Sequence, residues 1–233
     1  MRKPRVFAPE LAPSVRLSGR EAHHLVHVLR VEPGREVVVF DGSGLEAAGR
    51  VESVEGGTVI LTLAGPKPAR CEPPVEVVLY VALLKGDKLA GVVRAGSELG
   101  VSRFVPLVSE RSVPRKMGRA KLERLRRIAL EAAKQSGRAK VPEVAEPLAL
   151  AELAPVEFGL VAHPYTSRAI NAINWPESGA VALASGPEGG FTEAEVEHLA
   201  GLGFAPVYLG PRILRAETAP LVLAAAVTTL RGF

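Results

Sequence analysis

The chain of 233 residues contains a single cysteine, Cys71. One thiol cannot form a disulfide within the chain, and it cannot supply the cysteine ligands of a structural zinc site. We therefore expect Cys71 to be an inert residue of a linker. Aromatic residues are also scarce, at 5% of the chain, which disfavours an extended stacking platform for single-stranded nucleic acid.

Targeting segments and phosphate-binding motifs are missing as well. No segment combines a basic start with the apolar core of a signal peptide, and no apolar run is long enough to span a membrane. This predicts a cytoplasmic protein. The patterns GxxxxGK[ST] and GxGxxG after a strand do not occur, which disfavours a nucleoside triphosphate or a dinucleotide as the ligand.

Two of the five histidines, His23 and His27, lie four residues apart on an expected helix. Such a pair can share a metal ion, but a metal site normally needs at least one further protein ligand and none is evident. We therefore expect no metal, and favour a pair that lies on the helix surface or faces RNA.

The first 66 residues read as a small β-rich domain. Apolar runs bounded by glycine-rich turns predict its strands at residues 37–40, 47–54 and 58–63. One helix, at about residues 19–30, precedes these strands. Residues 67–74 are rich in proline and predict a linker to a second domain, residues 75–233.

The second domain alternates short apolar strands with helices. The expected strands are at residues 75–83, 103–107, 158–162, 181–184 and 206–209. A helix is expected between the first two strands, at residues 87–100. Apolar strands separated by helices predict an α/β fold with a mostly parallel sheet covered by helices on both faces.

Two glycine-rich segments, residues 186–192 and 209–220, each follow an apolar strand and lead into a helix. Ligands of α/β proteins bind beyond the carboxyl ends of strands. Thr192 and Glu195 form a capping box that fixes the start of the first helix. Glu188 would repel a phosphate, which favours a cationic or zwitterionic ligand. The alternative is a pair of tight turns that bind nothing.

The final helix, from Pro220, is apolar on every face, which predicts that it is buried in a core or an interface. A basic cluster occurs earlier in the chain, within residues 111–127: Arg111, Arg115, Lys116, Arg119, Lys121, Arg124, Arg126 and Arg127. Apolar residues with helical spacing run through the same segment. It is either a solvated helix face or a surface for an anionic polymer such as RNA.

The two glycine-rich segments resemble those of SPOUT-class methyltransferases, specifically the bacterial enzymes that methylate N3 of a uridine in 16S ribosomal RNA. Further matching motifs lie at residues 24–30 (HLVHVLR), 40–42 (FDG), 85–88 (KGDK), 98–101 (ELGV), 109–111 (SER) and 135–138 (QSGR). The resemblance covers nearly the whole chain. It implies a C-terminal trefoil knot, a PUA-like N-terminal domain, a homodimer, S-adenosylmethionine as methyl donor and the small ribosomal subunit as partner.

The resemblance also implies where the functional residues lie. Cofactor contacts are expected from the two glycine-rich loops and the strands before them: Leu183, Ser185, Gly186, Pro187, Glu188, Gly189, Leu209, Gly210, Ile213, Leu214 and Thr218. RNA contacts are expected from Arg2, Arg5, Arg16, Arg30, Arg111, Arg115, Lys116 and Arg138.

Arg215 and Glu217 are the expected catalytic residues. Arg215 would orient the uracil and stabilise charge on its oxygens. The base that removes the N3 proton stays open among Glu217, Glu188 and His163. Glu217 also has a purely structural interpretation, as an acid favoured at a helix N-terminus.

Three other functions compete with this hypothesis. The chain could be a non-catalytic RNA-binding or ribosome-assembly protein, or a SPOUT methyltransferase acting on a different RNA target, such as transfer RNA or another rRNA atom. The third, an enzyme of phosphorylated ligands, is disfavoured by Glu188.

Overall fold

The computed structural model describes residues 3–229. They form two compact units. The N-terminal unit contains Met1–Glu72 and Ala133–Val141, and the C-terminal unit contains Pro73–Ala132 and Pro142–Phe233. The chain thus leaves the N-terminal unit inside the proline-rich segment and returns to it for nine residues (133–141) after a long helix. No sequence pattern indicated this return.

The N-terminal unit is built on a six-stranded sheet in the order β1-β3-β4-β5-β2, with β6 paired to β4. Its strands are β1 (Arg5–Phe7), β2 (Ser14–Leu17), β3 (Glu36–Phe40), β4 (Leu45–Glu55), β5 (Thr58–Leu63) and β6 (Lys67–Pro68). All neighbours are antiparallel except β1 and β3. The three predicted strands are confirmed. The other three are too short, at two to four residues, to show a period in the sequence.

The predicted helix at residues 19–30 is shorter and less regular than expected. An α-helix, α1 (Gly19–His23), continues as a π-helix, η1 (His24–Val28). The backbone N–H of Leu29 donates to the carbonyl oxygen of His24, five residues earlier, at 3.0 Å. The chain then leaves the helix at Arg30, whose φ is +50°.

The returning segment is held inside the N-terminal unit by ion pairs. Lys134 Nζ lies 2.8 Å from Glu21 Oε1, and Arg138 Nη2 donates to Glu72 Oε2 at 2.9 Å. The other oxygen of Glu72 accepts hydrogen bonds from the backbone N–H groups of Ala139 and Lys140, both at 2.9 Å. Glu72 therefore fixes the whole turn that follows helix α3 (Arg119–Ser136).

Cys71 also belongs to this region. Its Sγ donates to the carbonyl oxygen of Gly137 at 3.1 Å. Burial raises the pKa of the Cys71 thiol, and the neighbouring charge of Glu72 adds to the effect. Because the thiolate is the reactive form, a raised pKa fits the inert residue that the sequence predicted.

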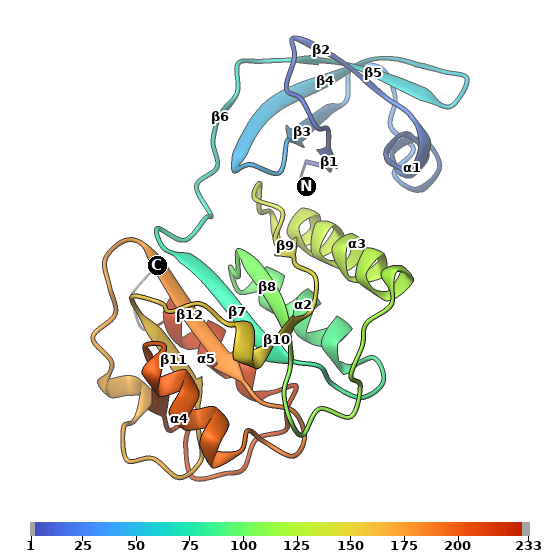
Figure 1. The fold of residues 1–233 in the computed structure, drawn as a ribbon. Coiled ribbons are helices and arrows are strands. Elements are labelled where there is room, and N and C mark those ends of the chain that lie inside the picture. Colours follow the sequence, from blue (N-terminus) through green and yellow to red (C-terminus); the bar gives the residue numbers. More distant parts are fainter. Residues whose placement is uncertain (1–2, 230–233) are drawn as a thin grey trace. The chain divides into compact units, whose positions relative to one another are not determined.

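The C-terminal unit contains a seven-stranded sheet in the order β10-β8-β7-β12-β11-β13, with β9 paired to β8 (Figure 1). Its strands are β7 (Glu76–Ala82), β8 (Arg103–Val108), β9 (Glu143–Val144), β10 (Leu148–Ala149), β11 (Gly159–Ala162), β12 (Ala180–Ser185) and β13 (Phe204–Val207). Every pair is parallel. The predicted parallel sheet is confirmed, and β9 and β10 were missed because each has only two residues.

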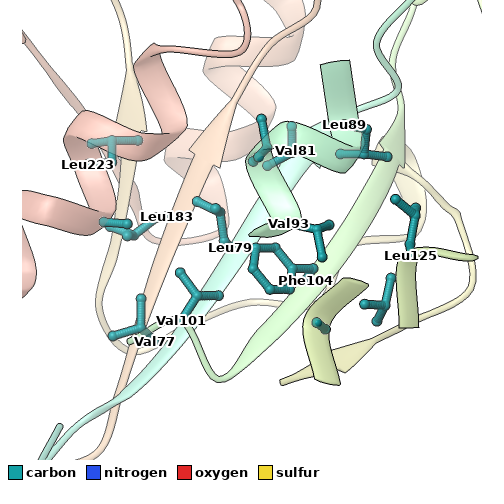
Figure 2. Close-up of a cluster of buried hydrophobic side chains, with 14 of the residues drawn as sticks. Val77, Leu79, Val81, Leu89, Val93, Val101, Phe104, Leu125, Leu183 and Leu223 are labelled. Carbon is teal, nitrogen blue, oxygen red and sulfur yellow. The ribbon is translucent and has the colours of Figure 1, made fainter. Parts of the chain in front are cut away.

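Helices cover both faces of this sheet, as predicted. On one face α2 (Lys88–Glu98), α3 and α5 (Ala219–Thr229) pack against the strands, where Val77, Leu79, Leu183 and Leu223 share a core (Figure 2). On the other face α4 (Glu193–Gly201) contributes Leu199 to a second cluster with Ala182 and Ala184. Alternate residues of β12 therefore face opposite layers, which is why the strand is apolar throughout.

Candidate active site

A cleft of about 720 Å³ lies where β11, β12 and β13 end. Three loops line it, after the strand ends at Ala162, Ser185 and Val207. These strands are parallel, so their carboxyl ends meet at one edge of the sheet. The remaining walls come from Lys88, at the start of α2, and from Arg111, in the loop after β8.

The loop after β12 is tightly folded. The backbone N–H of Gly190 donates to the carbonyl oxygen of Pro187 at 2.8 Å, and Gly190 has a φ of +68°. A Cβ on Gly186 would lie 2.9 Å from the backbone nitrogen of Phe191. Only glycine therefore fits at position 186, and the backbone there stays open to a ligand.

The capping box predicted for the next helix is present. Thr192 Oγ1 accepts from the N–H of Glu195 at 3.2 Å, and Glu195 Oε2 accepts from the N–H of Thr192 at 2.9 Å. Glu195 Oε1 also accepts from the backbone N–H of Glu110 at 2.7 Å. Arg111 donates to the carbonyl oxygen of Gly189 at 3.0 Å. The loops after β8 and β12 are thus fastened to each other.

Lys88 lies between two carboxylates on one wall of the cleft. Its Nζ is 2.9 Å from Glu188 Oε1 and 3.4 Å from Glu217 Oε2. Burial by itself raises the pKa of Glu188, but the hydrogen bond from Lys88 and backbone N–H donors outweigh it and hold this pKa below its usual range. The same pairing raises the pKa of Lys88. Two carboxylates and one ammonium leave this wall negative.

One carboxylate oxygen of Glu217 accepts no hydrogen bond from the protein. Its Oε2 is buried, and its contact with Lys88 lacks the geometry of a hydrogen bond. A buried acceptor without a donor is costly, and such groups normally have a partner. The oxygen lies at the cleft, so a ligand with a positive charge or an N–H group would satisfy it.

The loop after β13 forms the opposite wall and is more open. Ile213 is 75% exposed and Arg215 is exposed, although both line the cleft. Tyr165, from the loop after β11, is 83% exposed at the same cleft. Large apolar side chains this exposed indicate a surface that something else covers.

Replacing Lys88 with methionine should raise the pKa of Glu188. The variant removes the hydrogen bond and charge that lower it, while burial, which raises it, remains. A carboxyl ¹³C titration by NMR measures the change. Lys85→Met is the matched control, because Lys85 reaches Glu188 only through its backbone N–H, at 3.2 Å. An unchanged pKa in Lys88→Met would mean that the backbone donors alone hold Glu188 ionised.

Comparison with known proteins identifies the family. A family model described as an RNA methyltransferase domain matches residues 71–228, and one described as an RNA methyltransferase PUA domain matches residues 17–64. The chain belongs to this family of RNA methyltransferases. The loops at residues 185–191 and 209–219, which line the cleft, lie within the matched RNA methyltransferase domain.

Relatives with known names match over nearly full length. The chain is 36% identical to ribosomal RNA small subunit methyltransferase E of Bacillus subtilis, over 94% of this chain and 91% of that protein. It is 38% identical to the Synechocystis protein of the same name, over 97% and 77%. The crystal structure of the Neisseria gonorrhoeae protein of that name, bound to S-adenosylmethionine, superposes with a TM-score of 0.90, at 34% identity and 98% coverage of both chains.

Most residues predicted to bind the cofactor line the cleft of this methyltransferase. They are Ser185, Gly186, Pro187, Glu188, Gly189, Leu209, Gly210, Ile213 and Leu214, together with the two predicted catalytic residues Arg215 and Glu217. Leu183 and Thr218 do not. Leu183 is fully buried in the core beneath α5, so its side chain does not reach the cleft. The predicted contact between this side chain and the cofactor is therefore wrong.

The RNA-binding predictions need two corrections. Arg138 is 3% exposed and pairs with Glu72. Arg5 is half-buried: it pairs with Glu46 at 2.9 Å, donates to the carbonyl oxygen of Arg138 and lies over the ring of Phe40. Both arginines stabilise the N-terminal unit and are not available to RNA.

The other predicted RNA contacts differ in their surroundings. Arg16, Arg30 and Lys116 are exposed, whereas Arg115 donates to the carbonyl oxygens of Ser109 and Glu110. Arg111 lines the cleft itself. Arg2 lies outside the described residues.

Part of the basic cluster on α3 is committed to internal contacts. Arg124 forms a two-point pair with Asp87, and its hydrogen bond lowers the pKa of that carboxyl group. Arg126 pairs with Glu123 at 3.0 Å. By contrast, Arg119 and Arg127 are exposed, and within residues 3–229 neither has an ion pair. Only part of the cluster is therefore free to bind an anion.

Sequence reasoning missed the role of Lys88, although it lies in the matching KGDK motif. It also missed Tyr165, for which no sequence signal existed. Within residues 3–229 no group of three histidine, cysteine or acidic side chains is placed to hold a metal ion. In the same range no helix is long and apolar enough to cross a membrane.

Replacing Arg138 with methionine tests its structural role. We expect a loss of about 2 kcal/mol in the free energy of unfolding, below the roughly 3–5 kcal/mol of a fully buried broken pair, because Glu72 keeps two backbone donors. Thermal denaturation measures the loss, with exposed Arg35→Met as the control. An unaltered melting temperature combined with weaker RNA binding would restore the original prediction.

Proposed function

We propose that this protein transfers a methyl group from S-adenosylmethionine to N3 of a uridine in the 16S ribosomal RNA of the small ribosomal subunit. The observation that carries the proposal is the cleft: two glycine-rich loops and an unsatisfied carboxylate lie at the carboxyl edge of a parallel sheet. Relatives over nearly the whole chain carry the name of a small-subunit ribosomal RNA methyltransferase, and one is bound to that cofactor.

The residues of the cleft fit the cofactor. Gly186 and Gly210 both line the cleft without a side chain, so their backbone groups can offer hydrogen bonds to adenine and ribose. Leu209 and Leu214 supply apolar contacts, as small-ligand sites generally do. Glu217 Oε2 accepts a hydrogen bond or faces a positive charge. When bound, S-adenosylmethionine supplies an electrophilic methyl group on its sulfonium.

The protein's main task is to position the uracil. Holding two reactants in line accounts for a large share of a barrier reduction. Arg215 lines the cleft and is exposed toward it, so its guanidinium can donate to a uracil oxygen where negative charge develops as the N3 proton leaves.

The three candidates for the base that removes the N3 proton differ in their contacts. Glu188 has a lowered pKa and is held by Lys88, so it is a weak proton acceptor. Glu217 and His163 also line the cleft. We assign the role to Glu217, because its Oε2 has no hydrogen bond and lies farther from Lys88 Nζ, at 3.4 Å, than Glu188 Oε1 does, at 2.9 Å.

The proposed division of labour follows the domains predicted from the sequence, although residues 133–141 belong to the N-terminal unit. We assign RNA affinity to residues 1–66 and methyl transfer to residues 75–233, joined by residues 67–74. A homodimer in the cytoplasm and a trefoil knot around the cofactor loops complete the proposal. The exposed Tyr165 and Ile213, and the half-buried apolar residues Leu221 and Val222 on α5, support an interface beside the cleft.

The test uses labelled S-adenosylmethionine and small ribosomal subunits that lack base modifications, followed by nucleoside analysis. A 3-methyluridine product is the expected result. Cofactor binding without transfer would point to a different RNA target. Absence of both would favour a non-catalytic RNA-binding protein.

A further inference from the structure

The end of the first helix exposes an unusual set of side chains. Val28 is 61% exposed and Leu29 is 42% exposed, directly after the buried Leu25. The wide turn of the π-helix η1 places these two consecutive apolar residues at the surface. We call this the π-helix surface: Arg20, His23, His27, Val28, Leu29 and Arg30, all of them exposed.

Two backbone features of this surface are rare. π-helical turns are rare and are frequently found at functional sites. Arg30 is the only residue other than glycine with a positive φ within residues 3–229. Glycine adopts this conformation without strain, so an arginine here indicates that the side chain is needed.

The six residues of the π-helix surface include no acidic side chain. Glu21 is the only acidic residue in residues 19–30. Its Oε1 pairs with Lys134 and its Oε2 accepts from the backbone N–H of Phe7 at 3.2 Å, so it is turned away from the π-helix surface. The remaining polar side chains are arginines and histidines, which suit an anionic partner.

The histidines provide flat rings where the chain otherwise has few. The rings of His23 and His27 are in contact, with centroids 4.6 Å apart. Unpaired RNA bases stack on histidine rings and on arginine guanidinium planes, whereas double-stranded RNA is recognised by shape and phosphates. Exposed Val28 and Leu29 would add contact to a base face but nothing to a phosphate.

We propose that the π-helix surface binds unpaired nucleotides of the RNA substrate, with bases against the histidine rings, Val28 and Leu29, and phosphates on Arg20 and Arg30. This rests on the proposed function and specifies its substrate: a loop or single-stranded segment of ribosomal RNA near the target uridine, and not a duplex.

The first test compares the full-length protein with a Val28→Ser/Leu29→Ser variant. The ligands are a 16S rRNA fragment with an unpaired loop and the same fragment closed into a duplex. We expect about tenfold weaker binding of the looped fragment, which lies within the range of about 5- to 150-fold for the loss of one stacked base. Duplex binding, cofactor affinity and the salt dependence should not change. Val113→Ser is the control, because Val113 is 63% exposed in the C-terminal unit.

A second variant, Arg30→Gly, separates binding from folding. Glycine relieves the strain at φ +50°, so the melting temperature should rise. Loss of the guanidinium should weaken RNA binding and lower the slope of log affinity against log salt by about one. A purely structural Arg30 would give the higher melting temperature with unchanged RNA affinity.

The outcomes distinguish this inference from the proposed function. Unchanged affinity of the serine variant for the looped fragment, or an equal loss for loop and duplex, would overturn the inference alone. A wild-type protein that binds neither fragment and methylates no ribosomal RNA would overturn the proposed function.

Discussion

Replacing Arg215 with alanine is expected to lower kcat by about 10²–10³-fold, the usual effect of removing one donor that stabilises developing charge. The Kd for S-adenosylmethionine should change by less than about twofold. Arg215 lines the cleft but forms no ion pair within residues 3–229, and it is exposed. Its guanidinium is therefore free to reach a uracil bound in the cleft, as the proposed function requires.

Two measurements are needed, because turnover alone does not separate the roles. Calorimetric titration gives cofactor affinity, and single-turnover methylation gives the chemical step. Arg168→Ala is the matched control, since Arg168 is an exposed arginine that does not line this cleft. If cofactor affinity falls with the rate in Arg215→Ala, then Arg215 holds the cofactor and the uracil is oriented by another group, with Arg212 the first candidate.

Local sequence signals located the cleft well. The capping box of Thr192 and Glu195 depends on a spacing of three residues, and both of its hydrogen bonds are present. Strand, glycine-rich turn and helix is also a local pattern. Once the sheet is parallel, the loops after β12 and β13 must open at the same edge, so two local predictions gave one site.

Long-range pairing could not be predicted in this way. Arg138 belongs to a residue type that commonly contacts RNA. Its partner Glu72, however, lies 66 residues away in the sequence, and only folding brings the two side chains together. Lys88 meets Glu188 across 100 residues. An ion pair between such distant residues leaves no periodic trace in the sequence, so the same residue types fit both a surface and a buried role.

Side-chain direction was the other source of error. In β12 neighbouring residues point to opposite faces, and every residue of the strand is apolar or small. Leu183 and Ser185 lie two positions apart and so on the same face, and the pattern did not reveal that Leu183 is covered by the core whereas Ser185, at the strand's end, lines the cleft. The π-helix was missed because its i→i+5 hydrogen bonding covers only five residues, too few to show a different period in the sequence.

Replacing Gly186 with alanine is expected to weaken S-adenosylmethionine binding about 100-fold, at the upper end of what overpacking costs. The new Cβ would lie 2.9 Å from the backbone nitrogen of Phe191 and 3.1 Å from the carbonyl carbon of Gly190. Both are backbone atoms, so a side-chain rotation cannot relieve the contact and the loop itself must move.

The loop has little freedom to move. The Gly190–Pro187 hydrogen bond closes it, and the two oxygens of Glu195 hold its far end to Thr192 and to Glu110. Relief of the clash should therefore displace the backbone groups that face the cofactor. The methylation rate should recover in part at saturating cofactor, because the alanine does not touch Arg215.

Gly201→Ala is the control for this variant. Gly201 is the last residue of α4, its φ is not positive, and a Cβ there meets no atom within 4 Å. It should bind the cofactor as the wild type does. If Gly186→Ala also binds normally, the loop yields without cost and its backbone does not form the cofactor site. Tight cofactor binding by Gly201→Ala together with weak binding by Gly186→Ala would show that the affinity depends on the close packing at Gly186.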